Sequence, residues 1–111
     1  MKNCRGFAGH SVNDQGCFHV TSFGPTPARV AILDGVFLAV NVKKLKQAKV
    51  KFDETFLFHH YDMDFCLQCN KKGLKVGVWP FLINHRSPGL ANFHDEWVRS
   101  NENFIKKWKS S

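Results

Sequence analysis

The sequence predicts an α/β fold in which a short mixed β-sheet is flanked by helices. Residues 29–40 and 74–79 are rich in β-branched and large apolar side chains, as buried strands are. Residues 62–72 and 92–108 carry helix signals, so strand and helix patterns alternate along the chain. Because 111 residues, 43% of them hydrophobic, suffice for one core, we expect a single domain over residues 1–111.

The first third of the chain combines a loop-rich start with one long apolar segment. Residues 1–27 contain several Gly and Pro and no sustained periodicity, which predicts mostly loop with one short strand over 17–22. Residues 29–40 are predicted to form a strand buried on both faces, which Asp34 and Gly35 interrupt with a bend.

Three later segments are predicted to be helical. Residues 43–51 place five lysines around three apolar side chains, which indicates a short exposed basic helix with Asn41 as its cap. Asp62 suits a helix N-cap, so we expect the second helix to start there and to end at Lys72, directly before Gly73. The apolar residues of 92–108 follow helical spacing, so this last helix is amphipathic and is expected to pack against its own domain.

The charge balance points to anionic partners. Sixteen Lys and Arg against nine Asp and Glu give a formal net charge of +7, which suits phosphates, nucleic acid or acidic lipid headgroups. No apolar run approaches the about 18 residues of a membrane span, and residues 1–10 lack the pattern of a secretory signal. We therefore expect a cytoplasmic protein, with peripheral contact to a membrane surface as an option.

The four cysteines are expected to be free thiols. Without a secretory signal a reducing compartment is favoured, and four cysteines are too few for a disulfide scaffold. Cys66 and Cys69 have the spacing of a zinc half-site, but Cys4 and Cys17 do not provide a second one. A buried thiol that fills core space is the favoured interpretation.

Four carboxylates gather around the start of the predicted helix at 62–72. Carboxylates at such a place can bind a divalent metal ion or take a proton from a hydroxyl. They equally stabilise the first turn of a helix, so the residues alone leave both interpretations open. The four are Asp53, Glu54, Asp62 and Asp64.

The segment FDETFLFHHYDMDFCLQCNKKGLKVGVWP, residues 52–80, resembles a known family. It is similar to the C-terminal part of the GT-A glycosyltransferases of the family-2 type, which typically read Phe-Asp-Glu, a few aromatic residues, an acidic pair, one residue, Asp-Leu-Cys, then Gly and a strand. The segments LDGVFLA (33–39), GFAG (6–9) and NHRS (84–87) resemble neighbouring parts of the same family. The resemblance implies a fold equivalent to the C-terminal, acceptor-side half of a GT-A domain.

The resemblance also implies an activity and a set of site residues. The activity is transfer of a sugar, with inversion, from a nucleotide-diphosphate sugar to the hydroxyl of a saccharide or lipid-linked acceptor, assisted by Mg or Mn. Asp62 falls at the position of the general base, and the rings of Phe56, Phe58 and Tyr61 are expected to exclude water from it. Asp34, Gly35, Tyr61 and Asp64 are expected to face the acceptor, and His85 to bind the metal ion.

The sequence also departs from the family pattern. Tyr61 stands where the family usually has Glu, and Gln68 where it often has Arg. The family's nucleotide-binding half has no room within these residues, so the resemblance implies a fragment, one part of a split enzyme or a descendant that has lost catalysis. A separate donor-binding half is then a possible partner, and we expect self-association through the apolar surface left open.

Two other classes of function remain open. Lysines of residues 43–51 suit a small nucleic-acid-binding module, although no recognition motif accompanies them and nucleic acid is the less favoured partner. The amphipathic segment 92–108 suits a noncatalytic interaction domain that presents a helix to another protein.

Overall fold

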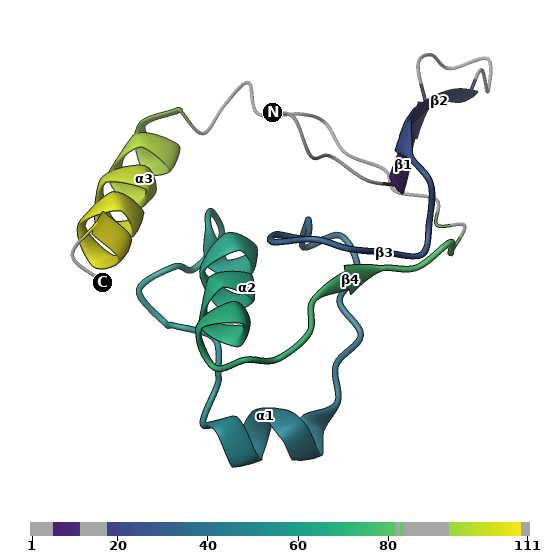
Figure 1. Cartoon of the computed structure of the whole chain (residues 1–111). Helices are drawn as coiled ribbons and strands as arrows, with labels where there is room; N and C mark the ends of the chain where they lie inside the picture. Colours follow the sequence, from purple (N-terminus) through teal and green to yellow (C-terminus); the bar gives the residue numbers. More distant parts are fainter. Residues whose placement is uncertain (1–5, 12–17, 82, 84–93, 110–111) are drawn as a thin grey trace.

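The structure is a computed structural model that describes residues 6–11, 18–81, 83 and 94–109. This part of the chain forms a small α/β fold in which three helices lie to one side of two short sheets (Figure 1). The elements in chain order are β1 (Gly6–Ser11), β2 (Phe18–Gly24), β3 (Ala28–Arg29), α1 (Val42–Ala48), α2 (Tyr61–Lys71), β4 (Gly77–Val78) and α3 (His94–Lys109).

The described strands form two antiparallel pairs instead of the expected mixed sheet. β1 pairs with β2 with an irregularity between Gly6 and Phe7, and β3 pairs with β4. The N–H of Val30 donates to the carbonyl of Val76 at 3.1 Å, which continues the second pairing by one residue. β2 agrees with the strand predicted over 17–22, of which residue 17 lies outside the described residues, whereas β1 replaces predicted loop.

The predicted buried strand over 29–40 is wrong beyond its first two residues. Among the described residues the pairing with the segment around β4 stops at Val30, and Val36 and Phe37 are 43% and 54% exposed. The bend at Asp34 and Gly35 turns the chain toward α2, so the residues after it have no described strand beside them. An apolar run indicates a preference for burial, but it does not provide the neighbouring strand that burial requires.

The core lies where α2, the end of α1 and the segment before β4 meet. Cys66 and Cys69 of α2 are buried free thiols, so the prediction that they fill core space is confirmed. Cys4 and Cys17, also predicted to be free thiols, lie outside the described residues. Burial raises the pKa of both thiols, and the Cys66 sulfur accepts the Leu33 N–H at 3.3 Å. The buried cluster consists of Val50, Phe65, Cys66, Cys69 and Val76, with Val30, Leu33, Leu45, Ala48 and Leu74 packed against it.

Local capping signals set the limits of α1. The Asn41 side chain accepts the Lys44 N–H at 3.1 Å, so the predicted cap is confirmed. The helix ends at Ala48 instead of residue 51, because Lys49 adopts the left-handed conformation with φ 58° and its N–H turns back to the last carbonyls.

α2 begins one residue earlier than predicted, and its cap is a different residue. His60, with φ 64°, is the N-cap, and Asp62 therefore lies inside the first turn. This corrects the prediction that Asp62 caps the helix, and it leaves the Asp62 side chain available to the 34–35 bend. At the other end Gly73 follows the cap with φ 74°, as the sequence predicted.

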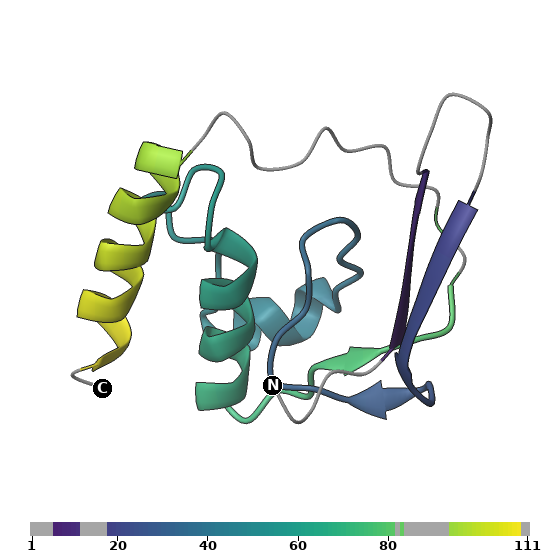
Figure 2. The same ribbon diagram turned by 90° about the horizontal axis from the view of Figure 1, so that it is seen from above.

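α3 packs against its own chain, as expected. In Figures 1 and 2 it lies beside α2 and runs in the same direction. The Phe104 ring lies 6.2 Å from the Phe56 ring, and Trp97 lies 5.1 Å from His60. Of the predicted helix, residues 92 and 93 lie outside the described residues. None of the helices in the described ranges is both long and apolar enough to cross a membrane.

His60 joins α2 to α3 through a polar contact inside the packed rings. Ser100 donates its hydroxyl to the His59 carbonyl at 2.9 Å, so its oxygen accepts the Nδ1–H of His60 at 2.8 Å. Burial lowers the pKa of His60 below its usual 6.5, and the neighbouring His59 lowers it further. The fold therefore favours the neutral form of His60.

The depressed pKa of His60 predicts a loss of stability on mild acidification. Above 6.5 the ring is neutral in both states, whereas below 6.5 the unfolded chain binds the proton more readily and is favoured. We expect the urea concentration at the midpoint of unfolding to be lower at about pH 5 than at about pH 7. The decrease should be smaller in His60→Asn, because Asn accepts a left-handed φ and does not titrate. Equal pH dependence of the two proteins would contradict this assignment.

Candidate functional site

The bend at 34–35 lies directly against the start of α2. The Gly35 N–H donates to Oδ2 of Asp62 at 2.8 Å, and the Tyr61 hydroxyl donates to the Gly35 carbonyl at 3.3 Å. Asp34 shapes the bend, because its Oδ1 accepts the Val36 N–H at 3.1 Å. The structure thus brings together Asp34, Gly35, Tyr61 and Asp62, which we call the bend–helix site.

Close approach of Tyr61 requires glycine at position 35. A Cβ placed on Gly35 would lie 2.0 Å from the Tyr61 hydroxyl oxygen and 2.6 Å from Cζ. Burial raises the pKa of Tyr61 above 10.0, and the negative charges of Asp62 and Asp34 raise it further. The phenol therefore stays protonated at neutral pH and acts as a hydrogen-bond donor at this site.

Asp62 presents a half-buried carboxylate that two backbone groups hold in place. Oδ2 accepts the Gly35 N–H, and Oδ1 accepts the Met63 N–H at 2.8 Å. A carboxylate has about four lone-pair positions, so two such bonds leave acceptor capacity for a hydroxyl. The arrangement suits a carboxylate that orients a hydroxyl and accepts its proton.

The aromatic surroundings of Asp62 differ from the expectation. Tyr61 is next to the carboxylate and half-buried. Phe56 is instead buried against Phe104 of α3, and Phe58 is 64% exposed. Of the three rings expected to exclude water, Tyr61 is therefore the one that the contacts place at the site.

Asp64 lies in the interior and not in the bend–helix site. It is 0% exposed, so no part of its carboxylate is open to an acceptor in this structure. Oδ1 accepts the Trp108 indole N–H at 2.9 Å and lies 2.7 Å from Nζ of Lys107, while Oδ2 accepts the Gln68 amide at 2.8 Å. The expected acceptor contact is replaced by a link between α2 and α3.

Lys107 completes this link by pairing with a second carboxylate. Its Nζ lies 2.7 Å from Asp53 Oδ2. The hydrogen bond from Lys107, followed by those from Thr55, lowers the pKa of Asp53 to about 2. Burial by itself lowers the pKa of Lys107, but its hydrogen bonds to Asp53 and Asp64 raise it above 10.5 overall. No local pattern in the sequence indicates this link, because its partners lie more than 40 residues apart.

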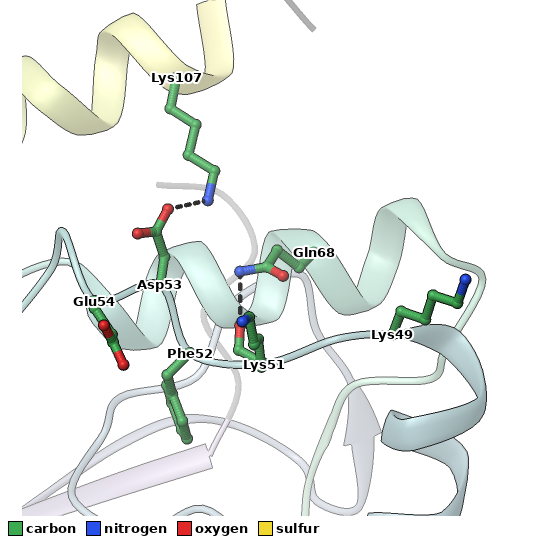
Figure 3. Close-up of a pocket in the computed structure, with 7 residues that line it drawn as sticks. All are labelled: Lys49, Lys51, Phe52, Asp53, Glu54, Gln68 and Lys107. Atoms are coloured by element: carbon green, nitrogen blue, oxygen red, sulfur yellow. Dashed lines mark hydrogen bonds and ion pairs between the residues drawn. The ribbon is translucent and has the colours of Figure 1, made fainter.

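A pocket of about 450 Å³ lies beside this ion-paired group (Figure 3). Of the four carboxylates predicted around the helix start, Asp53 and Glu54 line it, whereas the described residues of the bend–helix site do not. Phe52 relates the pocket to the bend–helix site, because its ring is 6.1 Å from that of Tyr61. The lining residues are Lys49, Lys51, Phe52, Asp53, Glu54, Gln68 and Lys107.

The expected metal ligand, His85, lies outside the described residues. The described ranges contain no cluster of three or more His, Cys, Asp or Glu side chains placed to hold a metal ion. At the bend–helix site, backbone N–H groups rather than other ligands face the Asp62 oxygens. The described residues by themselves do not assemble a ligand set for Mg or Mn.

Comparisons with protein-family models, with curated proteins and with solved structures find no match to this chain.

Proposed function

We propose that this chain supplies the acceptor-binding side of an inverting sugar transfer from a nucleotide-diphosphate sugar to a hydroxyl group. The supporting observation is the 2.8 Å hydrogen bond from the Gly35 N–H to Asp62. It joins the two segments that carry the resemblance, 33–39 and 52–80, at the residues to which the family assigns acceptor contact and proton removal. Asp62 is the general base of the proposed reaction.

The proposed reaction is a single displacement at the anomeric carbon. The acceptor oxygen attacks this carbon as Asp62 takes its proton, and the bond to the nucleotide diphosphate breaks on the opposite face. A carboxylate is a weak base, so its larger contribution is to hold the hydroxyl in line for attack. The Tyr61 hydroxyl and the exposed Asp34 carboxylate flank this position and are the proposed acceptor contacts.

The donor side is proposed to come from a separate nucleotide-binding half. A divalent ion, Mg or Mn, would neutralise the leaving diphosphate. The resemblance implies His85 of this chain as a ligand to that ion. The chain described here then contributes the positioned carboxylate and the acceptor surface.

Amide NMR of the isotope-labelled chain tests the acceptor side directly. We expect titration with a panel of mono- and disaccharides to shift the amide signals of Gly35, Tyr61 and Met63 for at least one sugar. Asp62→Asn should weaken this binding, whereas the matched control Asp95→Asn, in the first turn of α3, should not. Shifts confined to other parts of the chain, or no response to any saccharide, would contradict the proposal.

Calorimetry tests the separate donor half. We expect UDP-sugars with Mn to give little heat on mixing with the chain, because the nucleotide is proposed to bind elsewhere. Clear micromolar binding would show that the chain holds its own donor site. That result would leave the acceptor proposal standing and overturn only the division into two halves.

A further inference from the structure

Exposed lysines occupy two segments that contain no acidic residue. Residues 36–51 hold five lysines and residues 65–83 hold three, without a single Asp or Glu in either segment. All eight side chains are exposed. We call these residues the lysine end: Lys43, Lys44, Lys46, Lys49, Lys51, Lys71, Lys72 and Lys75.

The two segments belong to one end of the molecule. Leu45 and Ala48 on the inner side of α1 pack against the same buried cluster as Leu74, which follows α2. Figure 1 shows α1 next to the carboxyl-terminal end of α2. Because one core holds these elements together, their outward lysines form a shared cationic surface.

Most acidic residues of the described chain lie in other places, and Asp53 and Glu54 are the ones that line a pocket together with Lys49 and Lys51. Asp62 and Asp64 are in the first turn of α2, and Asp95 and Glu96 are in the first turn of α3. Within the described part of the chain the ion pairs are those that Lys107 makes, so the eight lysines form none. The lysine end therefore keeps its positive charge for a partner.

The chemistry of this surface fits a bilayer better than a nucleic acid. Lysine is a flexible point charge suited to a diffuse layer of negative headgroups, whereas arginine dominates the bidentate recognition of phosphates and bases. Neither of the two segments that carry the lysine end, 36–51 and 65–83, contains an arginine. Val40 and Val42, 46% and 56% exposed, stand at the start of α1 and can enter the apolar boundary of a bilayer beside the lysines.

We infer that the lysine end binds the surface of a bilayer that carries anionic headgroups, with α1 lying against them. The attraction is electrostatic, each lysine adds to it, and salt weakens it. The inference does not depend on the proposed sugar transfer, because it uses a different surface of the chain.

Vesicle sedimentation tests this inference. In about 0.15 M salt we expect the chain to bind phosphatidylcholine vesicles that contain about 30% phosphatidylglycerol, and not vesicles of phosphatidylcholine alone. The triple variant K43Q/K44Q/K46Q should lower the partition constant about a hundredfold, at about fivefold per lysine. K71Q/K72Q/K75Q should act similarly and serves where the first variant fails to fold, as circular dichroism reports.

The matched control removes three positive charges from outside the lysine end. R29Q/R99Q/K106Q changes the net charge by the same amount and should retain partition within about threefold of the unmodified chain, because these three residues belong to β3 and α3 and not to the lysine end. An equal loss in this control would overturn the inference, as would equal binding to neutral vesicles. Salt-dependent binding of a single-stranded oligonucleotide without vesicle binding would assign the lysines to nucleic acid instead.

Discussion

Replacing Asp64 with alanine is expected to lower the free energy of unfolding by about 3–5 kcal/mol, the usual cost of breaking a buried ion pair. The carboxylate is 0% exposed and accepts hydrogen bonds from Trp108 and Gln68 besides its contact with Lys107. Its removal leaves two half-buried donors without this acceptor and opens the contact between α2 and α3.

Urea unfolding of Asp64→Ala beside Asp53→Ala measures this effect. Both residues pair with the same lysine, Lys107, at 2.7 Å. The Asp53 side chain is 29% exposed, whereas that of Asp64 is 0% exposed. Water can replace the pairing at Asp53, so we expect a loss of about 1 kcal/mol or less there. Equal losses in the two variants would show that burial of Asp64 does not set its contribution.

Acid unfolding of Asp53→Ala provides a further test of the ion pair between Asp53 and Lys107. The pKa of Asp53 in the fold is about 2, below its ordinary 3.8, so the carboxylate stabilises the fold above 3.8. This contribution is lost as the pH falls from 3.8 toward 2. The variant should therefore differ from the unmodified chain above this window and converge with it below.

Features set by neighbouring residues could be predicted from the sequence. The Asn41 cap and Gly73 after α2 depend on hydrogen bonds and backbone angles within a few residues, and both are confirmed. The prediction that Asp62 caps α2 was wrong, because the actual cap depends on a distant contact. A left-handed His60 is held by Ser100 of α3, about 40 residues away, and no pattern near residue 60 indicates it.

Features that depend on distant partners could not be predicted from local patterns. The apolar character of 29–40 favours a strand, yet in the described chain only its first two residues pair with the segment around β4. Asp64 carries the same first-turn signal as Asp62, and only the position of Lys107 and Trp108 separates a buried link from an open carboxylate. Gly35 and Asp62 are 27 residues apart, so no local pattern predicts that they meet. The resemblance is what placed both of them at one site.

Replacing Gly35 with alanine is expected to lower the free energy of unfolding by about 1–3 kcal/mol, the usual cost of an added group in a packed place. The new Cβ would lie 2.0 Å from the Tyr61 hydroxyl oxygen, and this ring is already near that of Phe52. The ring must move, and with it the hydrogen bonds that hold the bend against Asp62. Saccharide binding at the bend–helix site should weaken in the same variant.

A double-mutant cycle separates this steric effect from backbone strain. In a Tyr61→Ala background the ring is gone, so Gly35→Ala should then cost less than about 0.5 kcal/mol. Gly73→Ala is the matched control, since no atom lies within 4 Å of its Cβ position but its φ is +74°. Its cost of about 1 kcal/mol comes from the left-handed backbone and should not change when Tyr61 is replaced. Equal costs of Gly35→Ala in both backgrounds would mean that contact with Tyr61 is not why this position requires glycine.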